Sequence, residues 1–266
     1  MGDYGRTYVR EPRKQQERKE REKVVEVPEE GLVSSLCDEA GYNREGLDNI
    51  ELEAKIDLEP CGLIRKSKIR MTLGEELTFP KPYSLDNVLA ESESIHYCYA
   101  FVSGSKLVPA FTKVTKGERT KIKIKGETEQ VERQGVIFLK RTEKHLEELS
   151  PLGVNKEIAE IARKSQMPLK YVGDFLKRSK EAFVFNPTSG RVFVISTNLC
   201  EAQGKNRLYQ LETEYYGQVN GFSSWEDVYE EMARLTKAIL TNGLPRLNYS
   251  GRNSTLSKFE WLIKNT

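Results

Sequence analysis

The chain has 266 residues, and its 42 basic and 40 acidic side chains leave a formal net charge of +2. This length is enough for one large domain or two small ones, and the balanced charge excludes a global field that would attract nucleic acid or anionic lipid. Four cysteines without a CxxC pair argue against a zinc ribbon or a disulfide scaffold. No apolar run approaches a membrane span of roughly 18 residues, and the N-terminus lacks the apolar core of a secretory signal. The composition therefore predicts a cytoplasmic protein without membrane association.

The chain divides into three parts by composition. Residues 1–30 form a charged arm in which Lys, Arg and Glu alternate with few apolar side chains. Such a segment cannot bury a face, so we expect a disordered or solvated arm, with contact to RNA or a partner protein as the alternative. Residues 31–245 form the main domain, beginning with a short helix at 31–38, and residues 246–266 form a C-terminal tail.

Alternating apolar and polar residues predict a series of strands. The first is IELEAKIDLE at 50–59, and the irregular region 60–98 that follows contains a candidate strand at 63–73. Further runs rich in aromatic and β-branched residues have the spacing and the Gly and Pro breaks of an antiparallel meander. They lie at 94–104, 106–117, 120–127, 136–143, 182–198 and 207–217.

Helical periodicity interrupts and then follows these strands. Within 150–180, Val154, Ile158 and Ile161 form one apolar stripe, and Leu169, Val172 and Phe175 continue it after a break at Pro168. The segment 223–243 is an amphipathic helix with a serine cap and acidic residues in its first turn. Ser254 can cap a last short helix. The order of elements predicts an α+β fold with a mostly antiparallel sheet.

Three of the predicted strands carry charges along one face. A side-chain period of two places Glu51, Glu53 and Lys55 on one side of the first strand. The other two strands present Lys121, Lys123 and Lys125, and Glu212 and Glu214. Each strand alone is typical of an ordinary strand with a solvated face. If the sheet closes into a barrel with the helices outside, however, the charged faces point inward.

The combination of these charges has a specific chemical meaning. Four carboxylates without histidine or thiolate suit a hard cation such as Mg²⁺ or Mn²⁺. Clustered lysines and arginines suit the oxygens of a polyphosphate. Together they describe a site for a metal ion and a triphosphate.

The order of these motifs resembles the CYTH, or triphosphate tunnel metalloenzyme, superfamily. Its ExExK motif matches Glu51, Glu53 and Lys55, and its basic strands resemble KIKIKGE and VIFLKRTE. A helical segment, the strand pair KRSKEAFVFNPTSGRVFV, the glutamate-rich strand YQLETEYYG and a packing helix follow in the family's order. The resemblance runs from about residue 48 to residue 242.

This resemblance implies an antiparallel closed β-barrel, a tunnel covered by helices. It implies that Glu51, Glu53 and Lys55 are catalytic and that the glutamates Glu51, Glu53, Glu212 and Glu214 hold Mg²⁺ or Mn²⁺. The implied phosphate-binding residues are Lys55, Lys121, Lys123, Lys125, Lys140, Lys180 and Arg191. Alternation in VIFLKRTE leaves open whether Lys140 or Arg141 faces the tunnel.

The implied activity is metal-dependent triphosphate hydrolysis. The substrate would be a small molecule that contains a triphosphate (inorganic, nucleoside or thiamine triphosphate) or an RNA 5′-end. An adenylate-cyclase-type reaction, a non-catalytic polyphosphate- or nucleotide-binding module, and an interaction protein whose charged faces are merely solvated remain alternatives. His96 and His145 are expected to be structural or surface residues, because neither has a Cys or Asp partner nearby.

Overall fold

The computed structural model of the chain describes residues 50–60, 79–146, 150–202, 206–219 and 222–265. The expectations for residues 1–30, 31–38 and 63–73 lie outside these described residues. In chain order the elements are β1 (Ile50–Pro60), β2 (Ser84–Val88), β3 (Ser92–Ser103), β4 (Lys106–Lys116), β5 (Arg119–Arg133), β6 (Val136–Leu146), α3 (Pro151–Ser165), β7 (Leu169–Asn186), β8 (Arg191–Ala202), β9 (Arg207–Gln218), α4 (Trp225–Ala238), the π-helix η1 (Ile239–Gly243), α5 (Leu244–Arg246), β10 (Tyr249–Ser254) and α6 (Lys258–Asn265).

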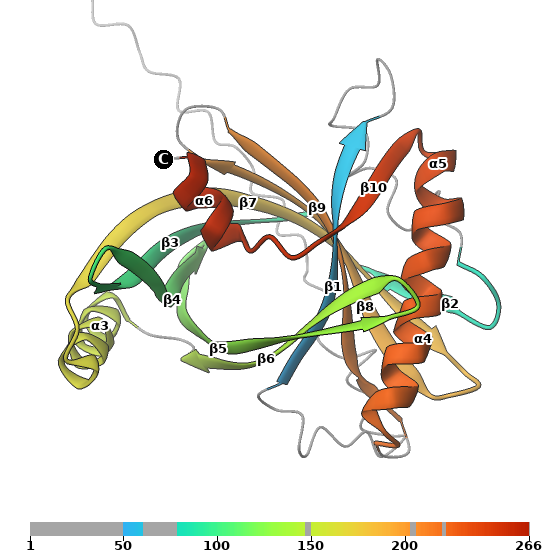
Figure 1. The fold of residues 1–266 in the computed structure, drawn as a ribbon, viewed down its shortest axis with the longest axis horizontal. Helices are drawn as coiled ribbons and strands as arrows, with labels where there is room; N and C mark the ends of the chain where they lie inside the picture. The colour runs from blue at the N-terminus through green and yellow to red at the C-terminus, as the bar shows by residue number, and fades with distance from the viewer. Residues whose placement is uncertain (1–49, 61–78, 147–149, 203–205, 220–221, 266) are drawn as a thin grey trace, which may run out of the picture.

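Eight strands close into an antiparallel barrel, in the order β1-β6-β5-β4-β3-β7-β8-β9 (Figure 1). The barrel is closed by pairing of β1 with β9, in which Glu53 lies opposite Glu214 and Lys55 opposite Glu212. Two further strands extend the sheet, since β10 pairs with the second half of β1 and β2 pairs with β7. The α+β fold and the closed barrel predicted from the sequence are therefore confirmed.

One part of the outer face of the barrel is apolar and is covered by α4. Leu52, Ala54 and Ile56 alternate with the charges of β1 and join a buried cluster with Val228 and Met232 of α4. Ser224 caps this helix by accepting a hydrogen bond from the backbone N–H of Asp227 at 3.1 Å. Complete burial of an aliphatic side chain of this size contributes about 1.5–3 kcal/mol, so the packing of α4 fixes which face of β1 turns outward.

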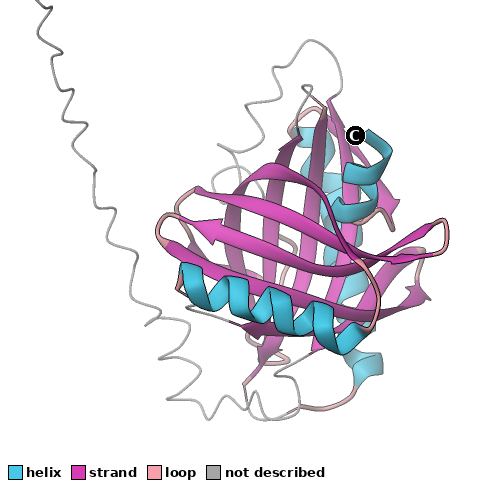
Figure 2. Cartoon of the chain, turned by 90° about the vertical axis from the view of Figure 1, so that its left-hand side faces the viewer, coloured by secondary structure: helices cyan, strands magenta, loops and turns pink. Residues whose placement is uncertain are grey.

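A second helix, α3, covers a different part of the outer wall, as Figure 2 shows. Its Val154 packs with Phe111 of β4 and Ile122 of β5, and Ile158 and Ile161 border this cluster. Among the described residues, no helix is long and apolar enough to cross a membrane.

The predicted helical stripe of Leu169, Val172 and Phe175 is wrong, because these residues belong to strand β7. The cause is a β-bulge: Cys98 pairs with Gly173 while Tyr99 pairs with Tyr171, so one residue of β7 is skipped. Val172 and Phe175 consequently contact the same cluster. A bulge in a strand thus produces a three-residue spacing that imitates a helix.

The C-terminal segment closes one end of the barrel. Trp261 and Leu262 of α6 pack on Phe175, Cys200 and Leu208, which belong to strands β7, β8 and β9. These strand residues share the side-chain direction of the cavity-lining residues described below, so α6 packs against the inner face of the wall. In Figure 1, α6 lies between β7 and the strands β4 and β5.

The cap of α6 differs from the prediction. Ser257, not Ser254, begins the helix: its hydroxyl accepts from the backbone N–H of Glu260, and the Glu260 carboxylate accepts from the backbone N–H of Ser257. This reciprocal capping box satisfies two backbone donors. It also fixes the direction in which the next residue, Lys258, leaves the helix.

Candidate active site

A cavity of about 290 Å³ lies inside the barrel, and its wall is strongly charged. It is bounded by side chains from the eight barrel strands and from α6. The charged side chains that line it are Glu51, Glu53, Lys55, Lys123, Lys125, Arg141, Lys177, Glu181, Glu212, Glu214 and Lys258.

All four glutamates of the two motifs line this one cavity. The register of β1 against β9 explains this, because Glu53 and Glu214 are directly opposed and Glu212 lies opposite Lys55. Within the part of the chain that is described, no three His, Cys, Asp or Glu side chains gather as in a formed metal site. Three of the four carboxylates contact basic side chains instead.

Glu53 is fully engaged by cations. Its carboxylate lies 3.0 Å from the Lys55 ammonium group and also accepts a hydrogen bond from the Arg141 guanidinium. Burial would raise the pKa of Glu53, but Lys55 and Arg141 outweigh it and lower that pKa to about 2. Arg141 also donates to Glu51. One guanidinium therefore joins both glutamates of the first motif.

Glu212 is held by residues from three other elements. Its carboxylate accepts from the Lys258 ammonium at 2.5 Å and from the Asn198 amide at 2.6 Å, and it lies 3.8 Å from Lys55. Burial again opposes ionisation, but Lys258 and Lys55 hold the pKa of Glu212 well below its usual value. The C-terminal helix thus contributes a cation to the cavity.

Glu214 differs from the other three glutamates. No hydrogen bond or ion pair joins its carboxyl group to another described side chain. Burial, with the nearby carboxylates of Glu51 and Glu53, raises the pKa of Glu214 to about 8. At neutral pH this carboxyl group is therefore mainly protonated, because the cavity already holds the negative charges around it. A cation bound among these groups would favour its ionised form.

Two of the predicted basic residues of β5 face the cavity. The Lys125 ammonium lies 2.9 Å from both Glu51 and Glu143, and that of Lys123 lies 2.7 Å from Glu143. Lys121, nearer the start of β5, does not line the cavity. The prediction for this strand thus agrees in placement for two of its three lysines.

The open choice on β6 is decided in favour of Arg141. Lys140 lies on the outer side, where its ammonium group is 4.6 Å from the centre of the Trp225 ring of α4. Phe138, two residues earlier, packs on the same side against Tyr229. The placement of Lys140 in the phosphate-binding set is corrected, because it shares the outer face with an apolar residue buried under a helix.

Lys180 is also turned away from the cavity. It has the side-chain direction of Ala182 and Val184, which belong to the outer core, whereas Lys177 and Glu181 line the cavity. Lys180, the one cation of this strand in the predicted set, therefore points to the outer face. Its neighbour Lys177 takes the inner position.

Arg191 lies outside the cavity in a buried cluster under α4. Its guanidinium donates to Glu231 at 2.5 Å and to the Ser223 hydroxyl at 2.7 Å. Glu231 also accepts from Asn186 and Ser189. This prediction is corrected too, because every described partner of Arg191 belongs to the attachment of α4 to the hairpin of β7 and β8.

Several cavity residues were not found from the sequence. Lys177 was missed because its segment has a helix-like spacing, and Lys258 because the C-terminal segment was treated as a tail. Glu143 contacts both cavity lysines of β5 and could have been found, since it alternates with Arg141 on β6.

His96 lines the cavity, but its described ring contacts are with an aromatic side chain and a hydroxyl group and not with the charged residues. Its ring stacks on Phe175 at 4.8 Å, and one ring nitrogen contacts the Ser94 hydroxyl at 3.0 Å. Burial lowers the pKa of His96 well below its usual value, and the positive charge of Lys177 lowers it further. The imidazole is therefore neutral at physiological pH.

No family model and no curated protein matches the chain. Among solved structures, the Mimivirus capping enzyme triphosphatase matches with 8% identity and a TM-score of 0.37, over 77% of this chain and 96% of that one. The Pct1 RNA triphosphatase of S. pombe matches with 11% identity and a TM-score of 0.31, over 82% and 87% of the two chains. The same enzyme in complex with the Spt5 CTD matches with 9% identity and a TM-score of 0.31, over 82% of this chain and 88% of that one. At these identities and TM-scores the likenesses do not establish a shared activity.

Proposed function

We propose that the protein binds a triphosphate inside the barrel and hydrolyses its terminal phosphoanhydride bond with the help of a divalent metal ion. The observation that carries this proposal is the crowding of four glutamates and several basic groups around one interior cavity. Burying so many charges is costly unless a ligand compensates them. The raised pKa of Glu214 supports a missing positive charge beside the carboxylates, since a bound cation would relieve the repulsion among them.

The donor set fits Mg²⁺ or Mn²⁺, because all four candidate ligands are carboxylate oxygens. In this proposal Glu51, Glu53, Glu212 and Glu214 hold the ion, and Glu53 and Glu212 exchange part of their contacts with basic side chains for it. When bound, such an ion stabilises the negative charge on the transferring phosphoryl group.

The basic residues of the cavity bind and orient the phosphates. Lys123, Lys125 and Arg141 line one side of the cavity, and Lys55 extends the set on β1. Their charges are balanced by Glu51, Glu53 and Glu143. A triphosphate would compete for these donors, and cationic groups held in place would stabilise charge that develops during phosphoryl transfer.

The chemistry of the cavity specifies a triphosphate but not its substituent. An inorganic, nucleoside or thiamine triphosphate, or an RNA 5′-end, presents the same phosphate oxygens to these cations. A second candidate function is non-catalytic binding of polyphosphate or nucleotide. This alternative is favoured by the ion pairs that already engage Glu51, Glu53 and Glu212.

The test is phosphate release from a panel of these triphosphates with Mg²⁺, with Mn²⁺ and with a chelator. Glu51→Ala and Glu214→Ala should each lower turnover by at least about 100-fold. Glu59→Ala is the matched control, because Glu59 lies on the same strand β1 but is exposed. Substantial turnover in either cavity variant would refute the assignment of the glutamates. Binding without turnover in the wild-type protein would favour the second candidate, and absence of binding would refute both.

A readout independent of turnover is the unfolding temperature. A metal that binds only the folded protein stabilises it by mass action, so added Mg²⁺ or Mn²⁺ should raise the unfolding temperature of the wild-type protein. The same additions should leave Glu214→Ala unchanged. Equal stabilisation of both proteins would show that the ion binds elsewhere.

A further inference from the structure

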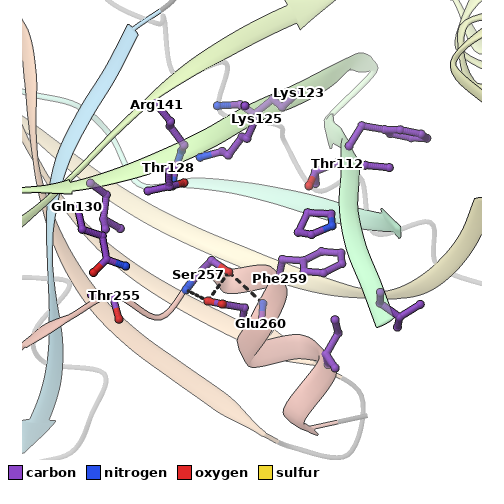
Figure 3. A pocket seen from close by; sticks show the side chains of 17 residues that line it. Thr112, Lys123, Lys125, Thr128, Gln130, Arg141, Thr255, Ser257, Phe259 and Glu260 are labelled. Carbon is purple, nitrogen blue, oxygen red and sulfur yellow. Dashed lines mark hydrogen bonds between the residues drawn. The ribbon is translucent and has the colours of Figure 1, made fainter. Parts of the chain in front are cut away.

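A second hollow of about 330 Å³ adjoins the charged cavity, between strands β4, β5 and β6 and the helix α6. The two hollows share Thr112, Lys123, Lys125, Arg141, Ser257 and Phe259 in their linings. Figure 3 shows Lys123, Lys125 and Arg141 on one side of this groove and residues of α6 on the other. A ligand held by the shared cations can therefore extend into the groove.

The groove depends on a bulge in β5. Lys125 pairs with Glu143 and Thr128 with Arg141, so Gly126 and Glu127 are accommodated at one position of β6. The side-chain alternation shifts by one residue there, and Thr128 and Gln130 continue the face that carries the lysines.

Gly126 allows a close approach to β6 at this bulge. A Cβ atom in its place would lie 2.2 Å from the Thr142 hydroxyl oxygen, which is closer than real contacts allow. The consequence for the groove is electrostatic. Without the shift, simple alternation beyond Lys125 would turn Glu127 and Glu129 toward the phosphate-binding cations. With it, uncharged side chains that both donate and accept hydrogen bonds line the groove.

The chemistry of the groove is different from that of the cavity. Beyond the shared cations its wall consists of apolar groups such as Leu139 and Phe259, with the hydroxyl and amide groups of Thr128, Thr255 and Gln130. The one acidic group, Glu260, uses its carboxylate to cap α6. In Figure 3 the Phe259 ring and the Gln130 amide border the same hollow.

We propose that this groove binds the nucleoside of a nucleoside triphosphate whose phosphates occupy the charged cavity; the inference thus rests on the triphosphate site proposed above. The Phe259 ring offers a face for stacking of the base, and Gln130 and Thr128 offer hydrogen bonds to its edge and to the sugar. Thr128, Gln130 and Thr255 are exposed. The nucleoside therefore stays at the opening, and the terminal phosphate reaches toward the glutamates.

The test compares two probes, tripolyphosphate and the β,γ-imido analogues of ATP and GTP, by calorimetric titration in Mg²⁺. The wild-type protein should bind at least one nucleotide analogue more tightly than tripolyphosphate. Gln130→Leu should weaken nucleotide binding by about 5–20-fold and leave tripolyphosphate binding unchanged within about twofold. Phe259→Ala should weaken nucleotide binding by a larger factor than tripolyphosphate binding, since Phe259 borders both hollows. Glu129→Gln is the control, since this exposed neighbour lies on the other face of β5.

The outcomes separate this inference from the proposed function. Gln130 is exposed, so its variant keeps the test valid if Phe259→Ala unfolds. Equal loss of both probes in Gln130→Leu, or no loss of either, would overturn the nucleoside subsite. Tripolyphosphate that binds and is hydrolysed, with no tighter nucleotide binding, would overturn the subsite and leave the proposed function intact. Absence of binding of either probe would overturn both.

Discussion

Two buried clusters of charge lie on opposite faces of the same barrel wall, and they differ in how completely they are neutralised. Under α4, Glu231 accepts hydrogen bonds from Arg191, Asn186 and Ser189, at distances of 2.5, 2.6 and 3.0 Å. Arg191 also donates to Ser223. We call these residues the α4 cluster. Its one carboxylate has its donors in place, and it holds a helix on the barrel.

The inner cluster, formed by Glu51, Glu53, Glu212 and Glu214 with their basic partners, lies against a cavity instead. Three of its carboxylates are paired, whereas Glu214 is kept largely neutral by burial and by its acidic neighbours. A buried pair with all its donors is what an architectural contact requires. Carboxylates so close together that one of them is protonated at neutral pH are expected where a cation binds.

The largest effect should come from breaking the α4 cluster. Arg191→Met leaves Glu231 buried without its cation, and the free energy of unfolding should fall by about 3–5 kcal/mol. Urea unfolding measures this loss, and the double variant Arg191→Met/Glu231→Leu should recover much of it. Tripolyphosphate affinity per folded molecule should not change. Weakened binding without lost stability would place Arg191 in the phosphate site after all.

A smaller effect should come from His96, which borders the inner cluster. Its pKa in the folded protein lies below the usual 6.5, so the unfolded chain takes up more protons as the pH falls through this range. The stability that neutral His96 provides is complete above pH 6.5 and is lost below it, by at most about 1.4 kcal/mol per pH unit. Between pH 7 and 5 the wild-type protein should therefore lose more stability than His96→Gln, by up to about 2 kcal/mol. Parallel unfolding curves for the two proteins would contradict this.

The smallest effect should come from Lys140, on the outer side of the inner cluster's own strand β6. Its cation–π contact with Trp225 contributes about 0.5–1 kcal/mol, which Lys140→Ala should remove without changing tripolyphosphate affinity. Arg141→Gln, one residue along, should lower that affinity by about tenfold. If the two substitutions weakened binding equally, the assignment of faces on β6 would be wrong.

Much of the fold could be predicted because strict alternation is a strong local signal. The strand at 50–59, the lysine-rich start of β5 and the glutamates of β9 were found in this way, and helical periodicity located the helix α4. The prediction was wrong where local geometry departs from regular alternation. At Gly173 a bulge made β7 look helical, and on β6 alternation allowed either Lys140 or Arg141 to face inward until the packing of Phe138 under α4 was known.

The sequence alone determined that Glu51, Glu53 and Lys55 share one face of a strand, because side chains in a strand alternate regardless of context. It also determined that Glu212 and Glu214 share a face of another. That both faces point inward and meet follows from the long-range folding of the chain, since closure of β1 on β9 depends on hydrogen bonds between segments far apart in the chain. The same long-range packing brought Lys258 of the C-terminal helix to Glu212, a contact that no local pattern specifies.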